Sequence, residues 1–259
     1  MLIPQSLKDR LNDPLTAQQS VFAGLAGQTL EAVGRLGPSG LEPIGLPGEL
    51  AERAGLGRQS STRLWGFGGR LRGLGQVHAT VILGPKAEIV NAMIYPQDPG
   101  LLPVFATEVV RFGTMIRVAF VDVQPLDRAA AWLDGLQREL QGLRAGFAER
   151  AELDPDLPGW LEGQCSGGEF LARSNDLSPA ATICEAWMAY LGAWIRRAEG
   201  LAAAGVAVAD SPAVAAYKHH HVVHSPGLVF LGKFFGEEWT RRYMSEFMYG
   251  SAYDYPSDS

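Results

Sequence analysis

Two consecutive segments rich in β-branched and aromatic residues, Val104–Phe112 and Ile116–Val123, constrain this chain more than any other feature. Such residues favour the pleated surface of a sheet, and Gly113 between the segments predicts a tight turn. Glu108 lies in the middle of the first segment. Strand alternation places it on one face with Val104, Ala106, Val110 and Phe112. Because Glu is almost never fully buried without a partner, this carboxyl must be paired, be protonated, or face a cavity that holds something polar.

Five strands of this kind follow one another between Ser60 and Val123, joined by short links that carry Gly or Pro. The predicted strands are Thr62–Phe67, Gln76–Leu83, Glu88–Tyr95, Val104–Phe112 and Ile116–Val123. Short links favour antiparallel neighbours. Several strands are apolar on both faces, which predicts helices on both sides. The expected fold is therefore α/β, a three-layer α/β/α sandwich with a central, mostly antiparallel sheet.

Two other polar residues lie on these strands. Asn91 shares a face with Ile89, Met93 and Tyr95, so its amide raises the same question as Glu108. Asp122 lies at a strand end shortly before Pro125. An Asp in that place often accepts hydrogen bonds from the backbone of the following turn, and we expect this role rather than a catalytic one.

Helical periodicity and capping residues predict the rest of the secondary structure. The predicted helices run from Asp13-Pro14 to Gly34, over Asp127–Arg150, from Ser178-Pro179 to about Gly205, and over about Gly227–Tyr249, with a short one at Gly48–Ala54.

The composition excludes several classes of protein. A net charge of −6 over 259 residues argues against a nucleic-acid-binding protein. Cys165 and Cys184 have neither a metal-ligand nor a redox spacing, which favours reduced thiols. The segment MLIPQSLKDRLNDP lacks an apolar signal core, and no apolar run reaches the ~18 residues of a membrane span. We expect a soluble cytoplasmic protein.

A glycine cluster and a histidine cluster could each indicate a binding site, but a structural role explains each of them better. The glycines Gly66, Gly68, Gly69, Gly73 and Gly75 lack the G-x-G-x-x-G spacing and lead into a strand, which favours twisted strands or bulges over a dinucleotide site. His219, His220, His221 and His224 form the one histidine cluster, and on a helix His220 and His224 would share a face. No nearby Cys, Asp or Glu completes a zinc set, so we expect no metal. His224 alone as a proton donor is favoured over a metal site.

An ordered set of segments resembles the ferredoxin-dependent bilin reductases, which are related to red chlorophyll catabolite reductase. IYPQDPGLLPVFATEVV and VAFVDVQP resemble the family's strand pair. The other matching segments, in the same order, are DPDLPGW at Asp154–Trp160, Arg173-Ser174-Asn175, Tyr217, and FFGEEWTRRYM at Phe234–Met244. The resemblance extends from about Val77 to Met248.

This resemblance implies a single bilin-reductase-like domain over residues 1–259 and a role in phytobilin biosynthesis. It implies that an open-chain tetrapyrrole such as biliverdin IXα binds between the sheet and the C-terminal helices. It also implies that electrons arrive one at a time from reduced ferredoxin through bilin radicals, with no bound cofactor. Heme oxygenase is the implied partner that supplies the bilin.

The resemblance also implies roles for individual residues. Glu108 occupies the position of a catalytic Asp in the bilin reductases, and a Glu there is similar to red chlorophyll catabolite reductase. Asn91 replaces a His of the phycocyanobilin-forming enzymes, as in the phycoerythrobilin- and phytochromobilin-forming members. Glu108 is the expected proton donor, since an apolar pocket favours its acid form. Asn91 would hydrogen-bond a pyrrole lactam or a central water, and His224 would be a second donor.

The expected substrate-binding residues depart from the family pattern. Thr80 replaces a Glu of the phycocyanobilin-forming enzymes, and Ser225 lies where many members have an Asp. Pro155 stands where a propionate-binding Arg is expected. The arginines that would bind the propionates instead are Arg117, Arg70 and Arg72.

Two other functions remain open at this stage. The same pocket could hold a tetrapyrrole without reducing it, as a carrier or scavenger; a metal-dependent hydrolase built on the histidines ranks third. Because ferredoxins are acidic as a class and this chain is acidic as well, docking needs a local basic patch. The expected patch contains Lys218, Lys233, Arg241 and Arg242, with Arg70 and Arg72 as further candidates.

Overall fold

A computed structural model describes residues 5–13, 20–36, 40–154, 156–201 and 211–250. Its centre is one eight-stranded sheet in the order β1-β3-β4-β5-β6-β7-β8, with β2 also paired to β3, and all the strand pairs are antiparallel. The strands are β1 Leu41–Pro43, β2 Glu52–Ala54, β3 Arg63–Leu71, β4 Gly75–Leu83, β5 Ala87–Pro96, β6 Val104–Phe112, β7 Met115–Gln124 and β8 Phe170–Ser174. The prediction of an antiparallel meander is confirmed.

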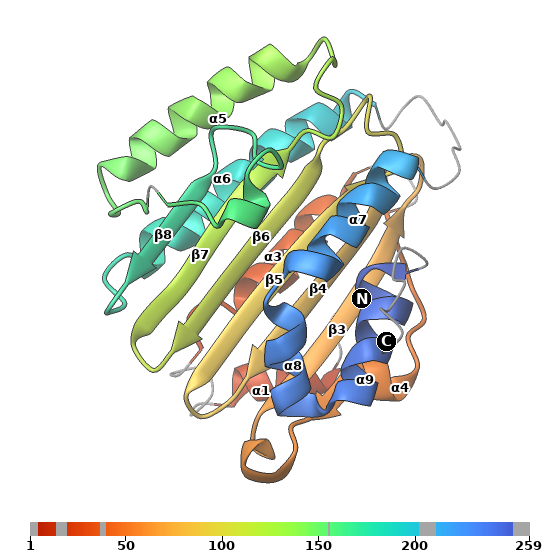
Figure 1. The fold of residues 1–259 in the computed structure, drawn as a ribbon, viewed down its shortest axis with the longest axis vertical. Helices are drawn as coiled ribbons and strands as arrows, with labels where there is room; N and C mark the ends of the chain where they lie inside the picture. The colour runs from red at the N-terminus through yellow and green to blue at the C-terminus, as the bar shows by residue number, and fades with distance from the viewer. Residues whose placement is uncertain (1–4, 14–19, 37–39, 155, 202–210, 251–259) are drawn as a thin grey trace.

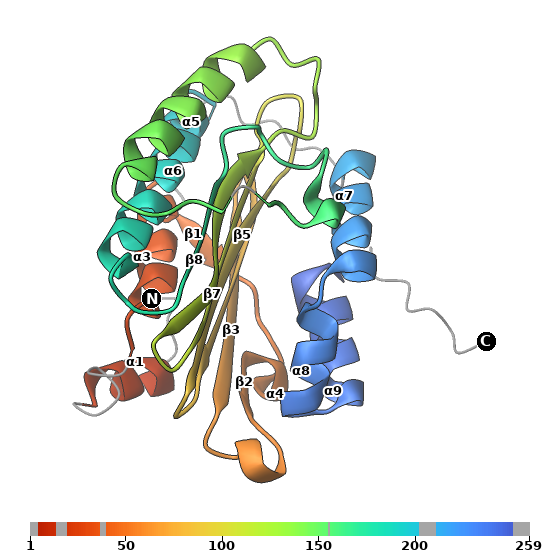
Figure 2. The same ribbon diagram turned by 60° about the vertical axis from the view of Figure 1, so that its left-hand side comes forward.

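Helices cover both faces of this sheet, as predicted (Figures 1 and 2). One face carries α3 (Gly24–Val33), α5 (Leu133–Ala148) and α6 (Ala180–Glu199). The other carries α7 (Pro212–His224), α8 (Gly227–Phe235), α9 (Glu237–Arg242) and the π-helical segment η3 (Tyr243–Met248). The shorter elements are α1 (Gln5–Asn12), α4 (Gly48–Ala51), and the turns η1 (Gly57–Gln59) and η2 (Gly159–Leu161).

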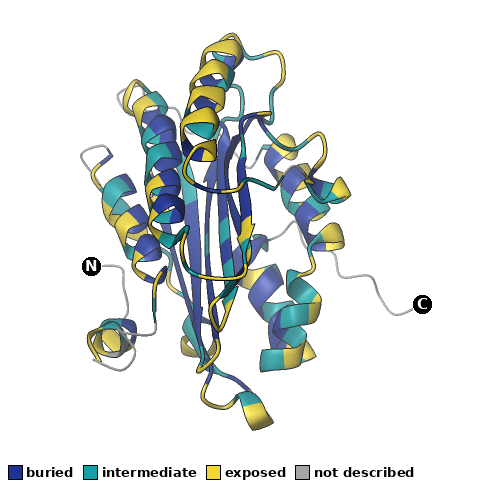
Figure 3. Ribbon diagram, turned by 90° about the vertical axis from the view of Figure 1, so that its left-hand side faces the viewer, coloured by how far each residue is buried: buried dark blue, intermediate teal, exposed yellow. Residues whose placement is uncertain are grey.

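The two layers of helices bury both sides of the strands. Figure 3 shows the strands buried over most of their length, while the helices expose only their outer sides. The larger core lies under α3 and α6, where Trp187, Tyr190 and Trp194 are fully buried. A second apolar cluster lies under α8, α9 and η3 and includes Phe235, Tyr243 and Phe247. No helix among the described residues is long and apolar enough to cross a membrane.

The helix predicted from Asp13-Pro14 to Gly34 begins later in the structure than the sequence indicated. Residues 14–19 lie outside the described part of the chain, residues 20–23 are not helical, and α3 begins only at Gly24. The reason is the buried Glu88 of β5. Its carboxylate accepts hydrogen bonds from the backbone N–H groups of Val21, Phe22 and Ala23. A charged acceptor from the sheet thus satisfies N–H groups that a helix start leaves unpaired.

The predicted helix over Gly227–Tyr249 is also wrong as a single element. Gly236 has φ +90°, a conformation that residues with a Cβ rarely adopt, and it separates α8 from α9. The backbone then changes to π-helix in η3. Helices α5 and α6 are shorter than predicted, and β8 and α7 were not predicted. β8 has only five residues, and the apolar residues of α7 are spread around the helix instead of forming one stripe.

Candidate active site

Three polar residues form a row across neighbouring strands on the face that α7–α9 and η3 cover. The register pairs Thr80 of β4 with Asn91 of β5, and Asn91 with Glu108 of β6. Directly opposed residues have Cβ atoms about 4.5–5.5 Å apart, so the three side chains are immediate neighbours. Strand alternation assigned each residue to a face, and the register brings them together.

This row forms the floor of a cavity of about 430 Å³. Ser225, Phe230 and Leu231, from α8 and the link before it, form one wall. The other wall comes from η3 and the residue that follows it, with Tyr243, Met244, Met248 and Tyr249. Five of the predicted site residues therefore line a single cavity: Thr80, Asn91, Glu108, Arg117 and Ser225. An apolar wall with a few convergent polar groups is typical of a small-molecule site.

Glu108 has no ion-pair or hydrogen-bond partner among the residues that the structure describes. The nearby Arg111 donates to Glu88 instead, at 2.9 Å. Burial raises the pKa of the Glu108 carboxyl above its ordinary value, because the charged form loses its hydration and gains no counter-ion. Burial thus shifts this carboxyl toward its acid form, and a carboxylic acid facing a cavity can donate a proton.

The polar neighbours of Glu108 differ in whether their side chains have hydrogen-bond partners. The Oδ1 atom of Asn91 is buried and has no partner in the described part of the chain. The Thr80 hydroxyl lies 2.7 Å from the Tyr243 hydroxyl, which connects the sheet to η3. Gly66 lies opposite Thr80 in the register, and a Cβ on it would come within 2.9 Å of the Tyr243 hydroxyl. Gly66 thus makes room for Tyr243, and Gly68 makes room for Phe247 in the same way.

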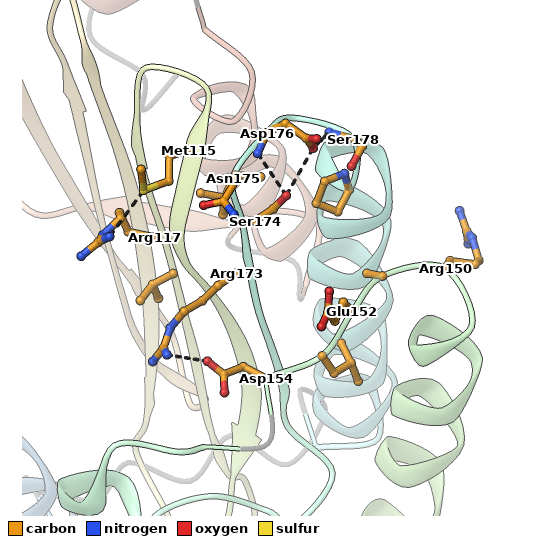
Figure 4. A pocket seen from close by; sticks show the side chains of 15 residues that line it. Met115, Arg117, Arg150, Glu152, Asp154, Arg173, Ser174, Asn175, Asp176 and Ser178 are labelled. Atoms are coloured by element: carbon orange, nitrogen blue, oxygen red, sulfur yellow. Dashed lines mark hydrogen bonds and ion pairs between the residues drawn. The ribbon is translucent and has the colours of Figure 1, made fainter.

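A second, more open cavity of about 980 Å³ adjoins the first, and Arg117 and Val118 line both. Figure 4 shows its polar wall, where Arg173 pairs with Asp154 and the Ser174 and Asp176 side chains contact each other. Arg117 contacts only a weak acceptor in this region, the Met115 sulfur at 3.4 Å. No carboxylate of the described residues lies within ion-pair distance of Arg117, which leaves this cation available at the junction of the cavities.

The other two predicted propionate anchors are not brought to the site. Arg70 is exposed on β3, and Arg72 in the turn that follows pairs with Glu42 at 3.0 Å. Neither lines either cavity. Of the three arginines proposed from the sequence, the structure places only Arg117 at a cavity, because β7 lies next to β6 whereas β3 lies three strands away from it.

His224 is likewise outside the cavity lining. It is exposed at the end of α7, and its Nδ1 lies 2.9 Å from the His220 carbonyl oxygen. The prediction that His220 and His224 share a helix face is confirmed, with ring centroids 4.3 Å apart. The next residue, Ser225, is the one that reaches the cavity.

A second group of buried polar side chains lies between α7 and the sheet, and only His221 among them was named as a candidate from the sequence. Nδ1 of His78, Oη of Tyr95 and Nε2 of His221 are buried without partners in the region that the structure describes. Burial lowers the pKa of His78 and of His221 to about 3, so both rings are neutral. The alternation in β4 places His78 on the same face as Thr80, and this signal could have identified it.

Asp122 has a structural role, but its partners are the next residue of its own strand and the distant Ser166, not the turn that was expected. Its carboxylate accepts N–H groups of Val123 at 2.8 Å and of Ser166 at 2.9 Å. Burial raises the pKa of Asp122 to about 6, and these hydrogen bonds oppose the rise. With its oxygens occupied by the backbone, Asp122 connects β7 to the segment before β8.

The Glu108 carboxyl thus faces an apolar cavity above the sheet. Comparison with known proteins identifies the family of the chain. The model of the family "Ferredoxin-dependent bilin reductase" matches residues 30–250. The chain belongs to this family. It is therefore an oxidoreductase with ferredoxin as electron donor.

Individual members of the family are similar over most of the chain. A 15,16-dihydrobiliverdin:ferredoxin oxidoreductase of Gloeobacter violaceus is 27% identical over 216 residues, 81% of this chain and 86% of that protein. The Nostoc punctiforme protein of the same name is 23% identical over the same shares. This bilin reductase also matches the crystal structure of phytochromobilin synthase from tomato in complex with biliverdin. That match has a TM-score of 0.74 and 16% identity, and it covers 89% of this chain and 83% of that one. It confirms the fold.

Proposed function

We propose that this bilin reductase reduces biliverdin, or a closely related bilin, through single-electron steps in which Glu108 supplies a proton. The observation that carries the proposal is the Glu108 carboxyl, unpaired among the described residues and raised in pKa by burial, on the floor of an apolar cavity. A donor of this kind suits a substrate that receives electrons from outside and must take its protons from the protein.

The shape of the site supports a tetrapyrrole as substrate. A bilin has an apolar conjugated ring system, polar lactam ends and two propionates. The apolar cavity would take the rings, and the unpaired Oδ1 of Asn91 would accept a hydrogen bond from a lactam or pyrrole N–H. At the junction with the open cavity, the Arg117 guanidinium would bind a propionate by charge-assisted hydrogen bonds.

The proposed reaction is balanced by two electrons and two protons. Two reduced ferredoxins each donate one electron, and biliverdin takes up two protons to give a dihydrobiliverdin. After the first electron the bilin radical is protonated by Glu108, which prevents return of the electron. The second proton comes from solvent through the open rim near Arg117, or from Glu108 after it has been reprotonated there.

The names of the relatives support a more specific product. Both are named for 15,16-dihydrobiliverdin. We infer that this chain reduces the 15,16 double bond of biliverdin, for which heme oxygenase is the source, and releases 15,16-dihydrobiliverdin.

The decisive experiment is anaerobic turnover with biliverdin and reduced ferredoxin, followed by absorption spectra and chromatography of the product. We expect biliverdin to be consumed with two electrons per molecule and a 15,16-dihydro product to appear. Mixing without a reductant should give a bound spectrum only. A protein that binds biliverdin but leaves it unchanged under reduced ferredoxin would be a carrier, and the reductase proposal would be wrong.

A further inference from the structure

The outer surface of α7 and α8 differs in charge from the rest of the chain. Residues 211–236 contain no Asp or Glu, although the chain has a net charge of −6. They contain two lysines, Lys218 and Lys233, and four histidines. The Lys218 ammonium lies 4.4 Å from the Tyr95 ring centroid, whereas Lys233 is exposed and has no carboxylate within ion-pair distance among the described residues.

The remaining cations of the expected basic patch are neutralised. Arg242 pairs with Glu49 and with Glu246, and Arg241 lies 3.8 Å from Glu237. Both arginines belong to α9, at the border of the acid-free segment. Of the four cations of the expected patch, Lys233 on α8 is therefore the exposed lysine that faces outward.

The same surface carries the most exposed large apolar side chains of the described residues. Val229 on α8 is 65% exposed, Val223 on α7 is 57% exposed, and Leu56 is 50% exposed. Leu56 lies against the end of α8, where its N–H donates to the Phe234 carbonyl. We call Val223, Val229, Lys233 and Leu56 the α7–α8 face. Val229 and Lys233 line one groove, and exposed apolar residues beside a cation are typical of a protein interaction site.

This face lies directly behind the substrate cavity. Gly227, Phe230 and Leu231 line the cavity from the inner side of α8, while Val229 and Lys233 lie on its outer side and line a groove toward α9. Figure 1 shows α7 and α8 in front of the sheet. A partner on this face would be separated from the cavity by one helix, which is about 10 Å across.

We propose that the α7–α8 face is the docking surface for reduced ferredoxin, a small acidic iron–sulfur protein. The inference rests on the proposed reduction of a bilin in the cavity behind this face. An acidic partner finds here a helical segment without carboxylates, a lysine for steering and valines for close contact, while Glu237 at the start of α9 borders the groove and is paired with Arg241. Electrons would then enter the cavity across α8, on the wall opposite Glu108.

The test uses oxidised plant-type [2Fe–2S] ferredoxin, whose binding to the full chain is titrated without turnover. Lys233→Glu and Val229→Glu should each raise the ferredoxin Kd about tenfold. The first replaces the attractive charge by a repulsive one, and the second replaces an apolar contact by a carboxylate that repels the acidic partner. The matched controls are Arg35→Glu in the turn after α3 and Leu101→Glu before β6, both exposed and away from this face. The controls should bind ferredoxin as the unmodified chain does, and all four variants should bind biliverdin normally.

Three outcomes would contradict or separate the proposals. Unchanged ferredoxin binding in both Lys233→Glu and Val229→Glu would show that ferredoxin docks elsewhere. A chain that is dimeric in sedimentation analysis and becomes monomeric in Val229→Glu would show that a second copy covers this face, which also overturns the inference. If ferredoxin binding follows the expected pattern but biliverdin is not reduced, the docking surface is supported and the proposed function is wrong.

Discussion

Asn91 and Glu108 lie directly opposite each other on β5 and β6, and both side chains face the same cavity. The amide carries no charge, so Asn91 does not stabilise the Glu108 carboxylate as a cation would. An imidazolium at this place would lower the carboxyl pKa, whereas burial beside an amide raises it. The pair therefore places a carboxyl with a raised pKa next to a neutral hydrogen-bonding group.

Glu108→Gln should separate binding from proton transfer. Gln keeps the size and hydrogen bonding of the side chain but has no acidic proton. We expect the variant to bind biliverdin and to stall after the first electron, with a radical visible by electron paramagnetic resonance. Glu108→Asp is the control, and it should keep part of the activity because its carboxyl lies one methylene back. A stable Gln variant with unchanged turnover would remove Glu108 from the mechanism.

The raised pKa of Glu108 also predicts how stability depends on pH. The folded state holds this proton more tightly than the unfolded state, whose Glu pKa is 4.5. The stability that the protonated side chain provides is therefore fully present below pH 4.5 and is lost as pH rises through the folded pKa. Relative to Glu108→Gln, the unmodified chain should become less stable over that range in urea unfolding. Parallel curves for the two proteins would mean that the carboxyl is not desolvated.

Arg117 should contribute to the affinity for biliverdin only by binding a propionate group of the bilin. Arg117→Gln is expected to weaken biliverdin binding about tenfold, the loss of one charge-assisted hydrogen-bonded contact. Biliverdin dimethyl ester, which carries no carboxylates, should bind both proteins equally. Arg70→Gln and Arg72→Gln are the matched controls and should leave both affinities unchanged. An effect of Arg72→Gln equal to that of Arg117→Gln would contradict the assignment.

Glu88 should be the most important carboxylate for stability. It is fully buried, pairs with Arg111 and accepts the N–H groups before α3. Glu88→Gln removes the carboxylate that pairs with the Arg111 guanidinium, which is 11% exposed, so we expect a loss of about 3–5 kcal/mol in the free energy of unfolding. Glu52→Gln breaks a surface pair with Arg63 and should cost less than about 1 kcal/mol. Equal losses in urea unfolding would show that the Glu88 contacts are not as described.

Gly66 should tolerate no side chain because Tyr243 covers it. Gly66→Ala places a Cβ 2.9 Å from the Tyr243 hydroxyl and threatens its bond to Thr80. We expect a loss of roughly 1–3 kcal/mol, as for other overpacked sites. Gly146→Ala on α5 is the control, since a Cβ there meets nothing within 4 Å and Ala favours a helix by up to about 1 kcal/mol. Thermal unfolding should move in opposite directions for the two variants, and a stable Gly66→Ala would show that Tyr243 can shift.

The sequence by itself determined the strands and the faces of their residues. Alternation along a strand is a local property with a period of two, so Glu108, Asn91 and Thr80 could be assigned to faces without a structure. Antiparallel pairing followed from the short links, and the family resemblance, which the family model confirms, supplied the class of enzyme.

The tertiary structure decided everything that depends on contacts between distant segments. The register places Thr80, Asn91 and Glu108 in one row. The order of the strands brings Arg117 to the cavity and keeps Arg70 and Arg72 away from it. Glu88 sets the start of α3 from 65 residues or more along the chain, and Gly236 divides a helix that periodicity joins. These outcomes arise from long-range hydrogen bonds and from one backbone dihedral angle, and neither leaves a periodic signal in the sequence.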